Sequence, residues 1–250
     1  MPLGAEQMCN LHSRRAFVVG GLSSLITFNG ADAQFHAGKA CGAAMGVAPP
    51  AGFTPTTGNS TLDKAIIGEL QIIRRLIPAN PMFKFYDDSQ SPNAMAYSPS
   101  PAGQLPIPMI QGTWGLVVLG LTLMRAELAP ATGGIALAGI LAHEVGHIWQ
   151  FQYPALERDL RGDTARNQEL HADYMAGFYF GREGRRNAND IEVFSRSLFN
   201  KGSYNFNNRD FHGTPEQRVT AMKLGYSQGR TGGDVGDIAY QGIQIVRNIR

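Results

Sequence analysis

The run HEVGH at positions 143–147 constrains this chain more than any other stretch of it. It stands in an apolar, helix-forming segment that begins near Gly134. Residues four apart in a helix lie one above the other, so the imidazoles of His143 and His147 project from one face and can bind a single metal ion. Glu144 is rotated by about 100° from His143 and is poorly placed as a third ligand, but it can hold a water molecule beside the metal. That is the position of a general base.

The simplest alternative is an exposed helix with two histidines on its surface. The residues around the motif oppose this alternative, because they make the helix apolar on most sides and therefore buried. They are Ile135, Leu137, Ile140, Leu141, Ile148, Trp149 and Phe151. Burying two imidazoles and a carboxylate without partners would cost free energy. The context of the motif therefore favours a metal site.

Composition excludes several classes of protein. Of the 250 residues, 43% are hydrophobic and 17% are charged, which is enough to bury a core in one or two domains. The formal net charge of +2 gives no electrostatic case for nucleic acid as a partner. Cys9 and Cys41 both stand near the N-terminus, and Cys9 falls in a segment that we expect to be removed. Neither a disulfide framework nor thiol catalysis is therefore indicated.

Residues 1–33 have the three parts of a signal peptide. Arg14 and Arg15 form the basic part, an apolar stretch too short to span a bilayer continues to Phe28, and a small-x-small cleavage site ends at Ala33. The paired arginines resemble the twin-arginine signal of bacteria, whose cargo leaves the cytoplasm folded. An ordinary secretory signal that happens to carry two arginines is the alternative. Both predict an exported protein, periplasmic or secreted, and the first makes the twin-arginine export machinery a partner of the precursor.

Residues 34–59 are rich in Gly, Ala, Pro and Thr without periodicity, which predicts a loop-like lead-in. Cys41 is not preceded by an apolar lipoprotein-type sequence, so no lipid anchor is expected. Residues 60–250 form the single domain that we predict. Within it, the uncharged apolar-rich run over 115–124 is too short for a membrane helix, so no stable membrane span is expected in the mature chain.

The part of the domain that precedes the metal helix predicts one long helix and a small sheet. Ser60 is a plausible N-cap, and apolar residues recur at helical spacing to Ile77, where Pro78 ends the run. Alternation and turn residues predict short strands over 82–86, 107–110 and 114–119. A short helix is expected to follow the last strand through Leu128.

A catalytic zinc ion takes three protein ligands and leaves a fourth position for water, so HEVGH lacks one ligand. No histidine stands at position 153, which excludes the metzincin pattern. A later helix, predicted over 164–180, carries Glu169 and Asp173 on one face, with His171 pointing the other way. Glu169 would then be a ligand, and Asp173 would accept the free N–H of a ligand histidine.

A solvated acidic face is the alternative for Glu169 and Asp173, and His171 is a second choice as the third ligand. The metal role is favoured because the helix is substantially buried, as its apolar side chains indicate: Met175, Phe178 and Phe180. Gly146 and Gly177 lie inside the two helices, where glycine costs roughly 1 kcal/mol relative to alanine. A close approach of the helices at the metal would explain both glycines.

A further helix start is predicted near the C-terminal end of the domain. Thr214 as N-cap, Pro215 at the first helical position and Gln217 at the third have the pattern of a helix N-terminus. His212 then stands in the loop just ahead of the helix, and Arg218 lies in its first turn. Residues from Gly225 onward precede a final short helix that we expect to dock on the domain.

Together these runs resemble the gluzincin metallopeptidases. HEVGH at 143–147, followed by ELHAD at 169–173, is similar to the CAAX prenyl protease and HtpX-like group and to bacterial neutral zinc metallopeptidases. The run NAMA at 93–96 resembles the Asn-Ala segment that precedes the metal helix in that group. The likeness covers roughly residues 92–225. The membrane-spanning helices typical of the prenyl protease and HtpX enzymes are absent, which argues against membrane substrates.

The resemblance implies a zinc-dependent endopeptidase with one zinc ion and three ligands: His143, His147 and Glu169. Glu144 would be the base. By the same resemblance, His212 would lie by the metal and stabilise the oxyanion of the tetrahedral intermediate, with Arg218 in support. A capping-loop histidine on the surface is the alternative for His212.

We therefore expect an α+β fold, a mostly helical zincin-type metallopeptidase domain with a small sheet beside the metal helix. The expected activity is hydrolysis of a polypeptide substrate by a zinc-activated water, and the substrate peptide would add as a strand to an exposed sheet edge. Two other functions use the same pattern. One is a non-catalytic peptidase-like binding module with a structural metal, which would have no need of Glu144. The other is metal-dependent hydrolysis of a non-peptide amide.

Overall fold

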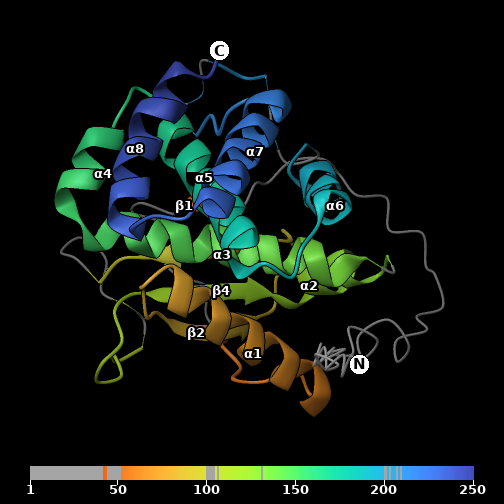
Figure 1. Cartoon of the computed structure of the whole chain (residues 1–250). Coiled ribbons are helices and arrows are strands. Elements are labelled where there is room, and N and C mark those ends of the chain that lie inside the picture. Colours follow the sequence, from red (N-terminus) through yellow and green to blue (C-terminus); the bar gives the residue numbers. More distant parts are fainter. Residues whose placement is uncertain are drawn as a thin grey trace, which may run out of the picture.

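Helix α3 (Gly133–Gln152), which carries the HEVGH run, passes through the middle of the molecule (Figure 1). The computed structural model describes residues 42–43, 52–99, 105, 107–130, 132–199, 202, 204–206, 208 and 210–250. The sheet and α1 (Ser60–Leu76) lie on one side of α3. The helices on the other side are α4 (Pro154–Leu160), α5 (Arg166–Glu183), α7 (Pro215–Thr231) and α8 (Val235–Asn248). With α2 (Leu121–Leu128) and α6 (Ala188–Phe199) also packed on α3, the fold is α+β and mostly helical, as the sequence predicts.

The sheet has the strand order β1-β3-β4-β2. Its strands are β1 (Gly42–Ala43), β2 (Met82–Tyr86), β3 (Ala94–Tyr97) and β4 (Leu116–Gly120). β3 pairs antiparallel with β4, whereas β1 pairs parallel with β3 and β2 pairs parallel with β4. β4 is buried along its whole length, because it lies inside the sheet and is covered on both faces. Thr54 also forms an isolated bridge with Phe85 of β2, so residues before α1 contact the sheet at two places.

Two of the three predicted strands are confirmed, and one prediction is wrong. Residues 82–86 and 116–120 are strands, but residues 107–110 are irregular. Pro108 removes a backbone donor from that short run, which weakens its ability to pair. The strand that pairs antiparallel with β4 lies over 94–97, in the run Ala-Met-Ala-Tyr, whose alanines have a weak intrinsic preference for strands. Pairing with the buried β4 therefore decides the conformation of this segment.

Most helix boundaries agree with the sequence pattern. The N-cap of α1 is Asn59 and not Ser60, because the Asn59 side chain accepts the backbone N–H groups of the next helical turn. Thr214 and Gln217 form the capping box predicted for α7. Pro154 ends α3 and also begins α4, a helix that the sequence pattern did not reveal.

Helices α5 and α7 contact each other through their backbones. A Cβ atom added to Gly177 of α5 would lie 1.9 Å from the carbonyl oxygen of Met222, and one added to Gly225 of α7 would lie 1.8 Å from the carbonyl oxygen of Tyr174. Gly177 therefore allows close contact with α7, not with the metal helix as predicted. Gly146 does face α5, since a Cβ there would lie 3.4 Å from Ala172 Cα. This packing fixes the position of α7 relative to α5, the helix that carries Glu169.

The predicted signal peptide, residues 1–33 with Arg14 and Arg15, lies outside the described residues, as do Cys9 and Cys41. Within the described ranges, no helix is both long enough and apolar enough to cross a membrane.

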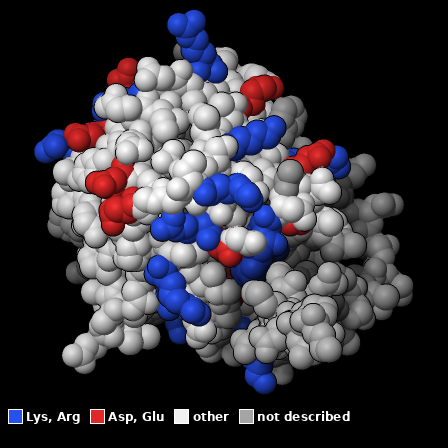
Figure 2. Space-filling view, viewed as in Figure 1, with Lys and Arg blue, Asp and Glu red and all other residues white. Residues whose placement is uncertain are grey.

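Basic side chains gather in a band across the face of the molecule shown in Figure 2, with acidic side chains mostly around it.

At the C-terminal end of α5, Arg185 and Arg186 form ion pairs with Glu69 of α1, and Arg186 also pairs with Glu183. The Tyr179 hydroxyl of α5 donates a hydrogen bond to Glu69 as well. These contacts link α1 to α5 and to the two residues that follow its C-terminal end.

The backbone contact between α5 and α7 leads to a stability prediction. Gly177→Ala is expected to lower the free energy of unfolding by about 3 kcal/mol, because the new methyl group meets a rigid backbone. Gly68→Ala in α1 is the matched control: nothing lies within 4 Å of the added Cβ, so helix propensity should raise the free energy of unfolding. Urea unfolding monitored by circular dichroism measures both variants. Equal effects of the two substitutions would contradict the proposed contact.

Candidate metal centre

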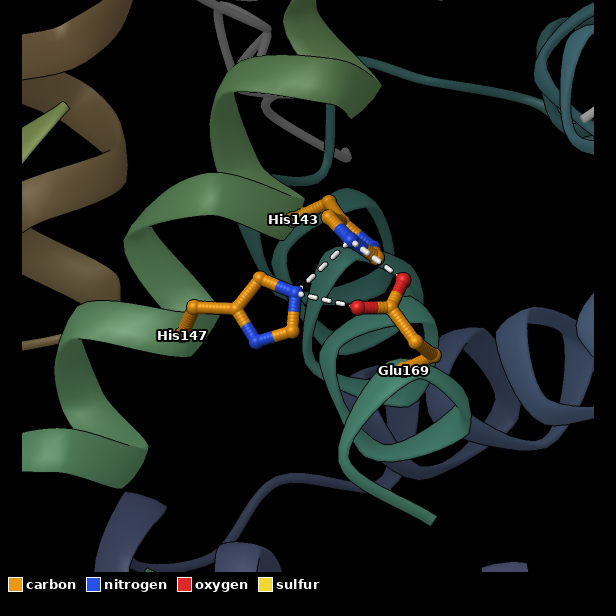
Figure 3. Close-up of side chains that lie close together, drawn as sticks. All are labelled: His143, His147 and Glu169. Atoms are coloured by element: carbon orange, nitrogen blue, oxygen red, sulfur yellow. Dashed lines mark hydrogen bonds and ion pairs between the residues drawn. The ribbon is translucent and has the colours of Figure 1, made fainter. Parts of the chain in front are cut away.

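The structure brings His143 and His147 of α3 together with Glu169 of α5, in the first turn of that helix. The two Nε2 atoms lie 3.0 Å apart, and the Glu169 carboxylate lies 3.4 Å from Nε2 of His143 and 3.2 Å from Nε2 of His147. Figure 3 shows the three side chains pointing toward one another from the two helices. All three are buried. This group could hold a metal ion.

The ring of His143 is oriented by Asp173. Its Nδ1 lies 2.8 Å from Asp173 Oδ1, and Asp173 also accepts hydrogen bonds from Nε and Nη2 of Arg218, at 2.7 and 2.9 Å. Burial by itself raises the pKa of Asp173, but the Arg218 and His143 charges lower it, so the carboxylate is an acceptor. His143 must therefore carry a proton on Nδ1, and its Nε2 faces Glu169 and His147. Asp173 thus contacts the predicted ligand His143, and Arg218 contacts Asp173.

The ring of His147 has a different partner. Its Nδ1 lies 3.1 Å from the side-chain oxygen of Gln150, one turn further along α3. Gln150 is fully buried and was not among the predicted site residues. The available signal was its position three residues after His147, which places both side chains on the same face of the helix. Both imidazoles therefore have a polar partner at Nδ1.

The centre brings electron-rich atoms together in the interior. Burial raises the pKa of Glu169, but His212, His147 and His143 lower it well below its usual range, so the carboxylate is ionised. Burial lowers the pKa of His143, yet Asp173 and Glu169 together raise it to about 10. The surroundings of these three side chains thus favour a positive charge between them. Either a proton or a metal ion can supply that charge.

Glu144 is fully buried, and neither of its carboxylate oxygens has a hydrogen-bond partner among the described residues. Burial raises its pKa to about 8, against the opposing effect of His143. Burial and the Glu144 charge also raise the pKa of Tyr97 in β3 to about 12. An unpartnered buried carboxylate is costly, and groups of this kind occur mainly where a reaction or a ligand needs them.

His212 and His171 have contrasting positions. His212 Nδ1 lies 3.0 Å from Glu169 Oε2, and its side chain is 20% exposed, so it belongs to the centre and is not a remote surface histidine. The backbone turns into α7 at Gly213, whose φ of 97° is a conformation that suits glycine. His171 lies outside the group, as expected from its direction on α5. It is buried against Gln150 and the carbonyl oxygen of Ala239 in α8.

The centre therefore contains every site residue that the sequence predicted, together with Gln150. Comparisons of the chain with protein-family models, with curated proteins and with solved structures give no match. What bears on function is accordingly the geometry of this site.

Proposed function

We propose that this protein is an exported zinc-dependent endopeptidase with a zincin-type fold. The observation that carries the proposal is the spacing of the three ligand groups. The two Nε2 atoms lie 3.0 Å apart, Glu169 Oε2 lies 3.4 Å from His143 Nε2, and Glu169 Oε1 lies 3.2 Å from His147 Nε2. Ligand atoms about 2.0–2.1 Å from a tetrahedral zinc ion lie roughly 3.4 Å apart. The ionised Glu169 carboxylate and the neutral His147 are suited to such an ion in chemistry as well as in distance, and the ion would replace the proton that the surroundings of His143 favour.

The number of ligands favours a catalytic site over a structural one. Structural zinc sites are closed by four protein ligands, whereas catalytic sites have three and leave one position open. The described residues supply three, from His143, His147 and Glu169. A bound zinc ion would supply Lewis-acid chemistry, polarising a water molecule and the carbonyl group of the scissile bond.

Glu144 has the properties of the general base. It is next to His143 in the chain and is absent from the ligand group. Its carboxylate has no hydrogen-bond partner among the described residues, so both oxygens are available to a water molecule. Its raised pKa suits a group that first takes a proton from the attacking water and then gives it to the leaving amine.

His212 is our candidate for stabilising the oxyanion. It is 20% exposed, whereas Glu169 is 1% exposed and Glu144 is fully buried. It therefore lies on the open side of the centre, where the carbonyl oxygen of a substrate would arrive. Arg218 forms an ion pair with Asp173, and its Nη2 lies 3.8 Å from Glu169 Oε2. Arg218 would therefore help to hold the Glu169 carboxylate in position. A donor at this position would stabilise the negative charge that develops in the transition state.

Strand β3 is our candidate for the edge that receives the substrate. It packs against α3 and carries Tyr97, whose pKa responds to the Glu144 charge. The two residues of β1 pair with Met95 and Ala96 on this edge and also pack near α3 and α5. A peptide that adds to β3 would therefore displace Gly42 and Ala43. The lead-in before the domain would then compete with the substrate.

Two other functions remain as outcomes of the tests. A binding module with a structural metal would retain zinc but would not depend on Glu144. A hydrolase of a non-peptide amide would use the same residues, and the β3 edge favours an extended peptide over a compact amide. Export follows from the signal peptide proposed for residues 1–33, with the twin-arginine machinery as the partner of the precursor.

Removing a ligand should remove the metal. His143→Ala, His147→Ala and Glu169→Ala are each expected to reduce bound zinc from about one ion per chain to a small fraction, because two ligands hold the ion far more weakly than three. Elemental analysis of purified protein measures this. Glu192→Ala, which removes a 62% exposed carboxylate of α6, is the control and should retain zinc. Full zinc occupancy in Glu169→Ala would contradict the ligand set.

Glu144→Gln separates an enzyme from a binding module. The amide keeps the shape of the side chain and one acceptor oxygen but lacks basicity, so zinc content and stability should be unchanged. Hydrolysis of an unfolded test protein is expected to fall by about 10² to 10⁴-fold, the usual contribution of a general base. Chelator-sensitive cleavage by the wild type provides the reference rate. Equal cleavage by the two proteins, or none by either over a broad peptide panel, would leave the peptidase mechanism without support.

Competition by the lead-in can be tested with proline. Replacing both Gly42 and Ala43 by proline removes their N–H donors and should weaken the pairing with β3. Hydrolysis is then expected to rise by up to about tenfold, since one net hydrogen bond contributes about 1 kcal/mol. Zinc content should stay the same, and the unfolding midpoint should fall only slightly. Unchanged or slower hydrolysis would show that the lead-in does not occupy the substrate position.

A further inference from the structure

Behind His147, a chain of buried hydrogen bonds crosses from α3 to α8. Gln150 Oε1 lies 3.1 Å from His147 Nδ1, and Gln150 Nε2 lies 2.8 Å from the carbonyl oxygen of Gln168 and 3.1 Å from His171 Nδ1. His171 Nε2 lies 2.9 Å from the carbonyl oxygen of Ala239 in α8. His147, Gln150 and His171 are all fully buried. We call this chain, from His147 through Gln150 and His171 to Ala239, the relay.

The direction of every hydrogen bond in the relay follows from its two carbonyl groups. A carbonyl oxygen only accepts, so His171 Nε2 must carry the proton and His171 Nδ1 must be an acceptor. The Gln168 carbonyl likewise requires that the Gln150 amide direct its NH₂ group toward it. The two protons of that group then match the Gln168 oxygen and His171 Nδ1. All hydrogen-bond donors and acceptors of the relay are therefore paired in only one orientation of the Gln150 amide and one tautomer of His171.

The opposite end of the Gln150 amide is therefore an acceptor, and it faces His147 Nδ1. His147 must carry its proton on Nδ1, which leaves Nε2 unprotonated and directed at Glu169 and His143. Reversing the amide would place its oxygen against the Gln168 carbonyl and His171 Nδ1, which are acceptors. The relay thus determines which nitrogen of His147 can bind a metal.

We infer that Gln150 and His171 are positioning residues that set the tautomer and orientation of the metal ligand His147 and connect it to α8. This inference rests on the metal site of the proposed function. His171, the second choice as a ligand from the sequence, acts here through Gln150 and does not touch the metal. Helix α8 contributes to the relay, since the carbonyl oxygen of Ala239 accepts the hydrogen bond from His171 Nε2. A Cβ atom added to Gly242 of α8 would lie 3.1 Å from the His171 ring, so the helix lies directly against that ring.

The first experiment removes the amide. Gln150→Met keeps a side chain of similar length without a hydrogen-bonding group of comparable strength. Zinc affinity, measured by competition with a chromogenic chelator, should fall by about 10 to 100-fold, the usual effect of losing the partner of a ligand histidine. Gln152→Met is the matched control, two residues further along α3, where the side-chain oxygen has no hydrogen-bond partner among the described residues. Its zinc affinity should equal that of the wild type.

The second experiment reads the tautomer directly. In metal-free protein, long-range ¹H–¹⁵N spectra should show His147 protonated on Nδ1 and His171 protonated on Nε2. Gln150→Met should lose the single His147 tautomer and leave that of His171 in place. A role in packing alone would change the unfolding midpoint without changing these signatures.

Two substitutions of His171 complete the test. His171→Asn retains an acceptor near the position of Nδ1, whereas His171→Phe retains only the ring, so the asparagine variant should bind zinc more tightly than the phenylalanine variant. Wild-type zinc affinity and an unchanged His147 tautomer in Gln150→Met would overturn the relay. A wild-type protein that binds no zinc would overturn the proposed function, and the tautomers of the metal-free protein would still test the relay.

Discussion

The arrangement of the helices depends on a buried cluster of two imidazoles and one carboxylate, from His143, His147 and Glu169. Two Nε2 atoms and an ionised carboxylate lie within 3.4 Å of one another and are buried from water. Left without a cation, such a group would be strongly unfavourable. The position of α3 between the sheet and the other helices provides the burial, and the polar partners of the two rings provide the orientation. The fold thus holds the three candidate ligand groups together from two helices.

The glycine contact between α5 and α7 has a consequence at the centre. Because Gly177 and Gly225 let the two backbones touch, the first turn of α7 comes close enough for Arg218 to form two hydrogen bonds with Asp173 of α5. Asp173 then orients His143 of α3. His212 lies just ahead of α7, so the position of α7 also brings its ring to Glu169. One backbone contact therefore positions side chains from three elements.

Side chains that share one face of a helix could be predicted from the sequence, because their spacing along the chain determines the face on which they lie. His143 and His147, or Glu169 and Asp173, share a face because they are four residues apart. The partner of His147 could not be predicted with equal ease, since the orientation of the Gln150 amide depends on His171 and Ala239, whose positions depend on how α8 packs. Strand β3 was missed for the same reason, because pairing with β4 overrides the weak strand preference of its alanines. Gly177 was assigned to the wrong neighbour, because the sequence does not say which helix lies against it.

The two ligand histidines are held in different ways, and the difference has an electrostatic meaning. His143 is held by a carboxylate whose charge Arg218 balances, whereas His147 is held by a neutral amide. Arg218 also lies 3.8 Å from Glu169, and burial raises the pKa of Glu144, so the centre combines charged groups of both signs with a carboxyl group that holds its proton more tightly than usual. A carboxylate in place of Gln150 would add a buried negative charge without a partner, which would cost stability and draw a proton onto a histidine. The neutral relay thus orients His147 without adding a charge to the centre.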